Sequence, residues 1–277
     1  MAETAAMHGY RDYHHLQCDF ADAGILRITF SNPGHLNSVT EGQHSELARI
    51  FRDVDGDDQV RVVLVTGADG TFSAGGDFGM IEDVINDWEA RVRCVKEVRE
   101  IVYSIIECSK PVIAAVEGTA VGAGLSVALL ADISVVTPTA RIIDGHLRLG
   151  VAAGDHAVMV WPILCGMAKA KYHLLTCTPI SGAEAERMGL VSLCVAPEEL
   201  QATALRIARE LADGPARAIA WTKHALNGWF RSAGESFDVS LAYEVLGGFS
   251  GPEGREGLAA LLEKRVPRFA APVSSRR

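Results

Sequence analysis

The sequence predicts an α/β fold in which strands and helices alternate through most of the chain. Short apolar runs typical of buried strands alternate with segments whose apolar residues recur every three or four positions, as in amphipathic helices. After Pro197 only helical patterns remain. We therefore expect an α/β core over residues 1–197 and a helical C-terminal region over residues 198–277, in a chain of 277 residues that is long enough for a sizeable core.

The first strand is predicted at residues 25–30, where apolar and polar side chains alternate as in a half-exposed strand, and we expect it at the edge of the sheet. From Glu41 the apolar residues follow helical spacing, Thr40 can cap the start of this helix, and Gly56 follows its end. The run at residues 62–65 is apolar on both faces. That pattern predicts a strand whose sheet is covered by helices on both sides.

The next part of the chain repeats this alternation. A long helix is predicted from Trp88, and Pro111 must end it. A glycine-rich turn at residues 118–124 leads into an apolar helix, and Ser181 with Glu184 forms the capping-box signature of a short helix. Further strands are expected at residues 112–116, 133–136 and 191–195.

Composition and charge exclude several classes of protein. The net charge of -9 disfavours nucleic acid as a partner, since it repels phosphate backbones. The uncharged stretch from Gly118 to Ala131 is shorter than the roughly 20 residues of a membrane span. Six scattered cysteines without a CxxC pair suggest neither zinc nor disulfides, and the N-terminus lacks the apolar segment of a secretory signal. We expect a cytoplasmic protein that binds no metal, nucleic acid or membrane.

Two loops place small residues directly after an apolar strand and before a helix, namely Thr71–Asp77 and Gly118–Gly124. Small side chains let a substrate approach the backbone, and N–H groups at a helix start have no intrahelical acceptor. Two such loops that converge can form an oxyanion hole, in which backbone N–H groups stabilise a developing negative charge. Either loop alone is better explained by tight packing at a turn between a strand and a helix.

The chain resembles the crotonase superfamily, also called the enoyl-CoA hydratase/isomerase family, over nearly its whole length. The matching segments are Ser31-Asn32-Pro33, Leu36-Asn37-Ser38, Val62 to Gly67, Phe72 to Asp77, Lys110 to Gly118, Gly122 to Gly124, Ala131-Asp132-Ile133, Ser181 to Val191, Arg255-Glu256-Gly257 and Glu263-Lys264-Arg265. This resemblance implies a spiral of β-β-α turns, a helical C-terminal trimerisation region, and a homotrimer or a hexamer built of trimers.

The resemblance also implies an acyl-CoA thioester substrate whose enolate is stabilised by two backbone N–H groups, with no cofactor beyond the coenzyme A that the substrate carries. The matching motifs place these donors at Gly76 and Ala123, with Gly122 beside the second donor as a substrate contact. Ala74 and Leu36 would lie along the path of the pantetheine and adenine groups. Lys264 matches a basic residue that can approach the CoA phosphates.

The chain departs from the hydratases of the family at their two glutamates, whose places are taken by Ser126 and His146. A serine hydroxyl has no useful basicity near neutral pH, whereas an imidazole can both accept and donate a proton there. Asp155 follows nine residues after His146, and a carboxylate next to a histidine can orient it and stabilise its cation. We predict a His146/Asp155 pair in place of the glutamates, which puts the ordinary hydratase mechanism in doubt.

Two other interpretations of these residues stay open. His146 can be a structural histidine, with Asp155 as the N-cap of the helix that runs toward Trp161. Alternatively, the string from His146 through Gly154 to Val160-Trp161-Pro162 resembles the β-diketone hydrolase branch, typified by 6-oxocamphor hydrolase. In that branch a His and an Asp at this spacing serve water activation and proton transfer, and Glu244 resembles a further acidic residue.

We therefore expect an enoyl-CoA hydratase/isomerase-like enzyme in which Gly76 and Ala123 donate N–H groups and His146 and Asp155 handle protons, with Glu244 as a further candidate. Two alternatives remain. One is a CoA-independent β-diketone hydrolase, which His35 favours because it stands where many acyl-CoA members have Lys or Arg. The other is a non-catalytic homologue that keeps the ligand pocket.

Overall fold

The computed structural model describes residues 10–269 and arranges their strands in two sheets. The larger sheet has the order β1 (Gln17–Asp22), β2 (Ile25–Phe30), β3 (Val62–Gly67), β4 (Val112–Val116), β6 (Ile133–Val136) and β9 (Leu193–Cys194). The smaller sheet contains β5 (Thr119–Val121), β7 (Arg141–Ile143) and β8 (Ile180–Ser181). All neighbours in the larger sheet are parallel except β1 and β2. The predicted α/β class is confirmed.

Three of the predicted strands appear at the expected residues, as β2, β4 and β6, and the core of β3 also matches. The prediction that β2 is an edge strand is wrong, because β1 pairs with it antiparallel and forms the edge. The segment Gln17–Asp22 carries only scattered apolar residues and a bulge between Phe20 and Asp22, so its pattern is weak. The last strand is shorter than predicted, since β9 contains only Leu193 and Cys194.

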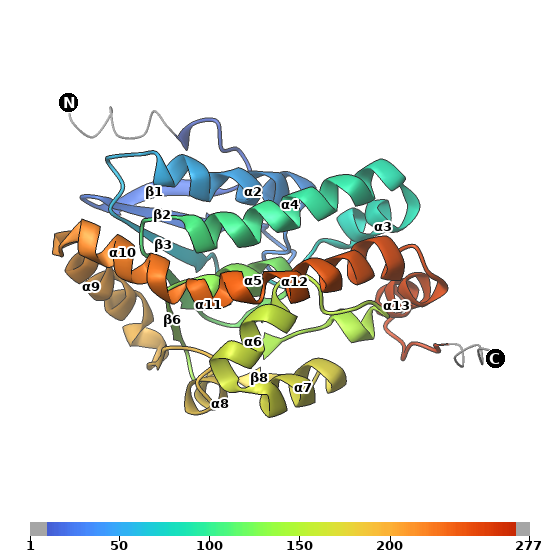
Figure 1. The fold of residues 1–277 in the computed structure, drawn as a ribbon. Helices are drawn as coiled ribbons and strands as arrows, with labels where there is room; N and C mark the ends of the chain where they lie inside the picture. Colours follow the sequence, from blue (N-terminus) through green and yellow to red (C-terminus); the bar gives the residue numbers. More distant parts are fainter. Residues whose placement is uncertain (1–9, 270–277) are drawn as a thin grey trace.

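Helices fill the connections between the strands and form the C-terminal part (Figure 1). The longer ones are α2 (Glu41–Asp55), α3 (Phe78–Asn86), α4 (Trp88–Glu107), α5 (Gly122–Leu130), α6 (Ala157–Cys165), α7 (Met167–Thr176), α9 (Leu200–Asp213), α10 (Ala216–Leu226), α12 (Gly234–Leu241) and α13 (Pro252–Leu262). Shorter ones are the 3-10 turns His146–Arg148 and Pro197–Glu199, α8 (Gly182–Arg187), α11 (Gly228–Ser232) and the π-helical segment Ala242–Gly248. Within residues 10–269 no helix combines the length and apolar character that a membrane crossing requires.

The predicted helix signals act as expected at most positions. Thr40 forms a reciprocal capping box with Gln43, and Gly56 follows the last turn of α2. The Ser181 side chain accepts a hydrogen bond from the N–H of Glu184 and caps α8. The glycine-rich segment is more ordered than predicted, because β5 occupies its first half and α5 already begins at Gly122.

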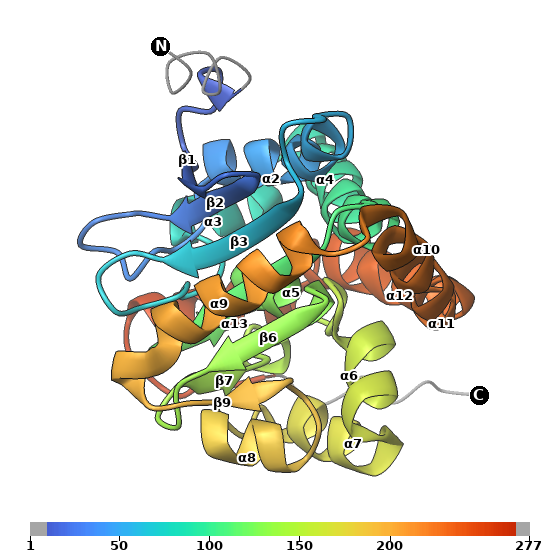
Figure 2. The same ribbon diagram turned by 90° about the vertical axis from the view of Figure 1, so that its left-hand side faces the viewer.

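The larger sheet is covered on both faces, as its doubly apolar strands require. On one face α9 lies across the strands, and its Leu200, Ala204 and Ala208 pack against Val62 and Ile113 (Figure 2). The other face packs against α2 and α4 in the main hydrophobic core. The boundary between residues 197 and 198 stays a prediction, and the helices beyond it contribute both to this core and to the cavity described below.

Candidate active site

The two glycine-containing loops lie against each other, as the oxyanion-hole prediction requires. The Ser73 N–H donates to the Thr119 carbonyl at 2.9 Å, and the Val121 N–H donates to the Ser73 carbonyl at 3.0 Å. Gly124 is required here, since a Cβ at this position would lie 2.4 Å from the Cβ of Ser73. At Gly122 the backbone has a φ of +50°, which favours glycine.

The hydrogen bonds that join these loops leave the N–H groups of Gly76 and Ala123 unused within the described chain. Gly76 is bracketed by Val39, whose N–H donates to the Gly75 carbonyl at 2.7 Å and whose carbonyl accepts from Asp77 at 2.9 Å. Ala123 is the second residue of α5, where the N–H has no acceptor in its own helix. Asp77 caps α3, with its carboxylate 2.9 Å from the Gly79 N.

Both loops line a cavity of about 280 Å³ whose walls are largely apolar. Seven predicted site residues line it, namely Ala74, Gly76, Gly122, Ala123, His146, Asp155 and Glu244. Leu36 and Lys264 do not. Leu36 is 63% exposed and reaches the site only through its carbonyl, which accepts from the Ala74 N–H at 3.0 Å. The CoA contacts assigned to Leu36 and Lys264 stay predictions.

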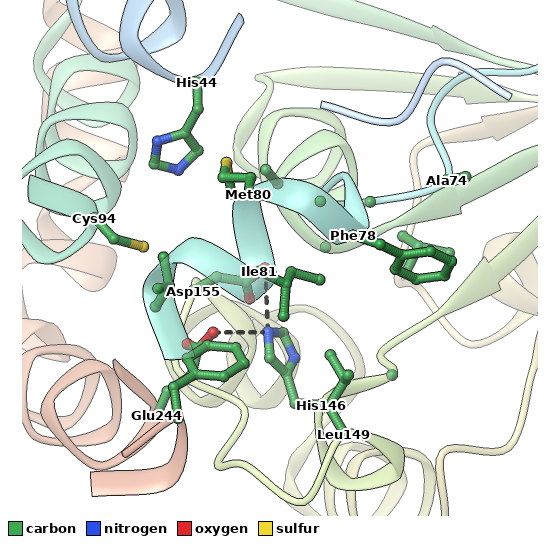
Figure 3. A pocket seen from close by; sticks show the side chains of 18 of the residues that line it. His44, Ala74, Phe78, Met80, Ile81, Cys94, His146, Leu149, Asp155 and Glu244 are labelled. Atoms are coloured by element: carbon green, nitrogen blue, oxygen red, sulfur yellow. Dashed lines mark ion pairs between the residues drawn. The ribbon is translucent and has the colours of Figure 1, made fainter. Parts of the chain in front are cut away.

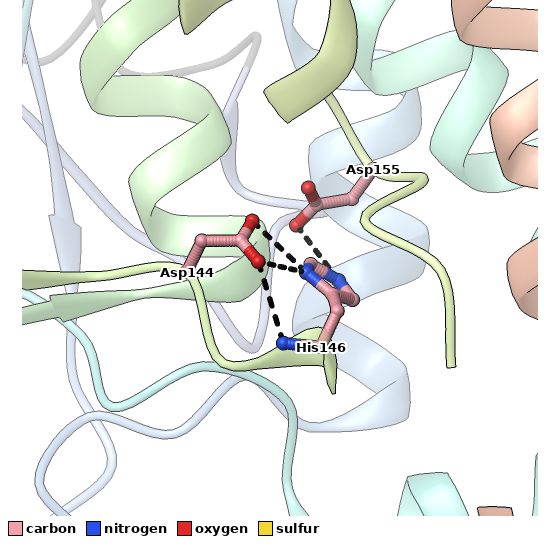
Figure 4. Close-up of side chains that lie close together, drawn as sticks. All are labelled: Asp144, His146 and Asp155. Carbon is pink, nitrogen blue, oxygen red and sulfur yellow. Dashed lines mark hydrogen bonds and ion pairs between the residues drawn. The ribbon is translucent and has the colours of Figure 1, made fainter. Parts of the chain in front are cut away.

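His146 lies in the cavity wall with carboxylates at both of its ring nitrogens. Its Nδ1 lies 3.0 Å from Asp144 Oδ2, and its Nε2 lies 3.6 Å from Asp155 Oδ2 and 3.4 Å from Glu244 Oε1. Figure 4 shows Asp144 and Asp155 on either side of the imidazole, and Figure 3 shows the ion pairs of His146 with Asp155 and Glu244. The predicted pairing of His146 with Asp155 thus exists in a larger cluster.

The sequence distributes these groups over four local structures. Asp144 directly follows β7, and His146 begins the 3-10 turn after it. Asp155 precedes α6, and Glu244 comes from the π-helical segment of the C-terminal region. Asp155 does not cap α6: His156 occupies the N-cap position, without a side-chain capping bond. The alternative role of Asp155 as a helix cap is therefore wrong.

The surrounding charges determine the protonation of the cluster. Burial opposes the charged form of His146, but Asp144, Asp155 and Glu244 together raise the pKa of this imidazole well above its ordinary value. Burial raises the pKa of the Glu244 carboxyl, against the opposing attraction of His146. The neighbouring carboxylates therefore favour the protonated, positively charged form of His146.

The pKa of the Asp155 carboxyl is shifted in the opposite direction. Burial disfavours its ionised form, yet the neighbouring imidazoles of His156 and His146 hold the pKa of this carboxyl below its ordinary value. Ser126, at a place where hydratases of the family have a glutamate, is buried and its hydroxyl lies 2.9 Å from His156 Nδ1. This serine therefore contacts the group behind Asp155 and does not line the cavity.

The same cluster has a spacing that a small cation could use. Asp144, His146 and Asp155 offer ligand atoms that lie within 4.8 Å of one another, and all three residues are buried. The expectation that the protein binds no metal stays a prediction.

Sequence reasoning missed three polar groups at the site. Asp144 could have been found from its position two residues before His146, where its Oδ1 also lies 3.4 Å from the His146 N–H. His156 directly follows Asp155, but no motif marks it. His44 of α2 lines the opposite side of the cavity with its Nδ1 2.6 Å from Glu97 of α4, and no local pattern connects these two residues (Figure 3).

Comparisons with known proteins agree with this architecture. Residues 21–272 match the family model described as enoyl-CoA hydratase/isomerase. The chain is 30% identical over 251 residues to the 1,2-epoxyphenylacetyl-CoA isomerase of Escherichia coli K12, which covers 90% of this chain and 95% of that protein. It is 31% identical over 246 residues to the short-chain-enoyl-CoA hydratase of Clostridium acetobutylicum, and this match covers 87% of this chain and 92% of that protein.

Solved structures give the same result. The crystal structure of an enoyl-CoA hydratase/isomerase from Mycobacterium paratuberculosis superimposes with a TM-score of 0.84 at 33% identity, over 88% of this chain and 97% of that one. The matched residues include both glycine-containing loops and the C-terminal helices. The chain belongs to the enoyl-CoA hydratase/isomerase family of the crotonase superfamily.

Proposed function

We propose that the protein adds water to, or removes it from, an acyl-CoA thioester through an enolate, with His146 and Asp155 in place of the usual glutamates. The observation that carries this proposal is the position of the His146 imidazole, flanked by Asp155 and Glu244, in a cavity that both glycine loops line. A proton donor and a carboxylate thus share one wall with two unused N–H groups.

The thioester oxygen would bind between the N–H groups of Gly76 and Ala123. As negative charge develops on this oxygen, the two donors stabilise it without reorganising, and one such donor contributes roughly 3 to 4 kcal/mol in well-studied hydrolases. The apolar walls of the cavity strengthen this interaction because they exclude water. Coenzyme A would extend from the cavity past Ala74 toward Leu36.

The proton transfers balance if the dyad acts as a unit. Water forms a bond to the β-carbon while the Asp155 carboxylate takes its proton, and the electrons of the C=C bond move to the thioester oxygen. The enolate then takes a proton at the α-carbon from the imidazolium of His146. The proton on Asp155 passes to His146 Nε2, 3.6 Å away, which restores the starting state.

Deuterium incorporation tests this proposal for acyl chains of any length. Enoyl-CoA thioesters of several chain lengths are incubated with the enzyme in D2O, and the products are examined by mass spectrometry and NMR. We expect 3-hydroxyacyl-CoA that carries one deuterium at the α-carbon, and a His146→Ala variant that forms none above background. Absence of any product from all thioesters would overturn the proposal.

A second candidate is a CoA-independent β-diketone hydrolase. The observation in its favour is that, among the described residues that line the cavity, there is no lysine and Arg148 is the single arginine, so few cations could approach the CoA phosphates. Asp155 and His146 would activate water toward a ring ketone, the C–C bond would break with its electrons forming an enolate, and that carbon would take the proton. The product is a keto acid.

The same assay distinguishes the candidates when cyclic β-diketones are added as a separate set of substrates. Cleavage of a diketone, with all thioesters untouched, identifies the hydrolase. A folded protein that turns over neither class but binds an acyl-CoA in calorimetry identifies the non-catalytic homologue.

A further inference from the structure

We propose that His156 is a positioning residue: it is held as a neutral imidazole with its hydrogen on Nδ1, and it fixes Asp155 so that one carboxylate oxygen faces His146. This inference rests on the proposed role of the His146/Asp155 dyad. It assigns a function to a histidine that lies behind the dyad and does not line the cavity.

His156 is fully enclosed by the protein. Its exposed fraction is 0%, as is that of the neighbouring Trp161, while Ser126 is 2% exposed. Each polar atom of such a side chain is expected to find its partner within the protein, because the side chain has no contact with bulk water. The partners of the two ring nitrogens therefore determine where the hydrogen lies.

Trp161 fixes the first nitrogen. Its indole Nε1 lies 3.3 Å from His156 Nε2, and an indole N–H can only donate a hydrogen bond. His156 Nε2 must therefore accept, which it can do only without a hydrogen of its own. An imidazolium, with hydrogens on both nitrogens, would place two donors against each other in the buried site.

The second nitrogen then carries the hydrogen and has suitable acceptors. His156 Nδ1 lies 2.6 Å from Asp155 Oδ1 and 2.9 Å from the Ser126 hydroxyl. The Ser126 hydroxyl donates its own hydrogen to the Gly122 carbonyl at 3.2 Å, which leaves its oxygen free to accept. All three contacts agree with one tautomer.

This arrangement divides the two oxygens of Asp155. Oδ1 is engaged by His156, whereas Oδ2 is left toward His146 Nε2 at 3.6 Å. A donor on Oδ1 fixes the plane of the carboxylate and favours its ionised form. Trp161, His156 and Asp155 thus form a buried series that ends at the imidazole in the cavity wall.

Imidazole 15N NMR tests the tautomer directly and independently of activity. We expect His156 to show a protonated Nδ1 and an unprotonated Nε2 in the wild-type protein. In Trp161→Phe, which loses the indole donor, a hydrogen on Nε2 should become populated. A wild-type spectrum with the hydrogen on Nε2, or with both nitrogens protonated, would overturn the proposal even if the enzyme turns over acyl-CoA.

Two substitutions of His156 test the positioning role. His156→Asn places an amide donor close to the position of Nδ1, whereas His156→Leu fills the space without a donor. We expect His156→Leu to lower kcat/KM by about ten- to a hundred-fold, as the loss of an outer hydrogen-bonding partner commonly does. We also expect the acid limb of the pH profile of His156→Leu to move to higher pH, because Asp155 would take up a proton more readily. His156→Asn should keep the acid limb of the wild type.

The pH profile separates positioning from mere packing. The titratable groups that face Asp155 are His146, His156, Glu244, Asp144 and Cys94, and only the His156 contact changes in these variants. If His156→Leu is folded by circular dichroism and keeps the wild-type profile, or if both variants lose activity equally, His156 has no positioning role. Failure of the proposed function would instead leave the 15N result intact and remove turnover from the wild type.

Discussion

At the scale of single residues, the position of one proton determines what His146 can do. Asp144 lies at its Nδ1, and Asp155 and Glu244 lie at its Nε2, so the charged form of the imidazole is favoured. A side chain in this state begins the reaction as a proton donor. Any step that needs a base must therefore use a neighbouring carboxylate, which makes Asp155 and His146 dependent on each other.

A double-mutant cycle tests this dependence. We expect His146→Ala and Asp155→Asn each to lower kcat by about 10² to 10⁴, the range of general acid–base catalysis. The double variant should lose little more than the worse single variant, because each residue acts through the other. Steady-state kinetics on an accepted substrate measures all four proteins.

Asp53→Asn serves as the control for this cycle, since it removes a half-exposed carboxylate of α2 far along the chain from the site and should add its small effect independently. Losses of His146 and Asp155 that add in free energy would show that the two side chains act separately.

At the scale of single elements, the π-helical segment Ala242–Gly248 sets the direction of Glu244. The preceding helix α12 is fixed by its buried Phe237 and Leu241, so the wide turn after it determines which way Glu244 points. Such π-segments occur frequently at functional sites. Glu244 Oε2 is buried without a hydrogen-bond partner in the described structure, which an element selected for packing alone would avoid.

Removal of one residue from this segment should turn Glu244 away from His146. Deletion of Ala242 would rotate Glu244 by about 100° around the helix axis, because an α-helix has 3.6 residues per turn. We expect kcat to fall as far as it does in Glu244→Ala. Deletion of Gly247, which lies after Glu244, is the matched control and should retain more activity; equal losses in the two deletions would contradict this assignment.

The start of α5 supplies the second element-level test. Ala123→Pro removes one backbone N–H in the first turn of a helix, where proline is best tolerated. We expect a loss of about 10² to 10³ in kcat, the usual effect of one oxyanion-hole donor. Ala123→Gly keeps the N–H and should stay near wild type. Full turnover by an Ala123→Pro enzyme with a normal circular dichroism spectrum would refute the role of this N–H.

Elements with strong periodicity could be predicted from the sequence, and weak ones could not. β2, β4 and β6 have continuous or alternating apolar runs, and α2 carries both of its caps, so local patterns define their limits. β1 could not be predicted because its pairing with β2, and not its own composition, makes it a strand. β5 is only three residues long and depends on β7, which lies about twenty residues further along the chain.

The candidate site shows the same limit. His146 and Asp155 are close in the sequence, so their pairing could be predicted from spacing and resemblance. Glu244 lies about ninety residues beyond Asp155 and reaches the cavity only through the packing of the C-terminal helices. His44 and Glu97 come together because α2 packs on α4, a contact that no local pattern encodes.

At the scale of the whole molecule, the buried imidazolium makes stability depend on pH. The folded protein holds the proton of His146 more tightly than the unfolded chain does. The stabilisation that His146 provides is therefore fully present below the pKa of about 6.5 that this side chain has in the unfolded chain. That contribution is lost as the pH rises through the folded pKa. The pKa of Glu244 is also raised, so this residue likewise lowers the free energy of unfolding as the pH rises above about 4.3.

We therefore expect the free energy of unfolding to decrease between pH 6.5 and 9, as measured by urea denaturation. Asp144→Asn is the control, because it removes one of the charges that raise the pKa of His146 and should make this decrease shallower. An unfolding free energy that stays constant over this range would show that His146 is not held as a cation.

The C-terminal helices expose large apolar side chains that suit an interface between copies of the chain. Trp221, Leu226 and Trp229 of α10 and α11 are each more than 60% exposed. We expect a trimer, or a hexamer of trimers, of this 29.6 kDa chain in light scattering. Trp229→Glu should shift the assembly toward smaller species, whereas Trp88→Glu, an equally drastic change on α4, should not. A monomeric wild type would exclude this assembly.

The excess of acidic over cationic groups around His146 also selects the form in which a ligand can enter. Asp155 and Glu244 both line the cavity, and they share the single imidazole of His146 at its Nε2. A second negative charge about 4 Å away is repelled by about 4 kcal/mol in a partly screened environment. We therefore expect a free carboxylate to bind more weakly than a neutral thioester or ketone, which would protect the proposed enzyme against inhibition by its hydrolysed ligands.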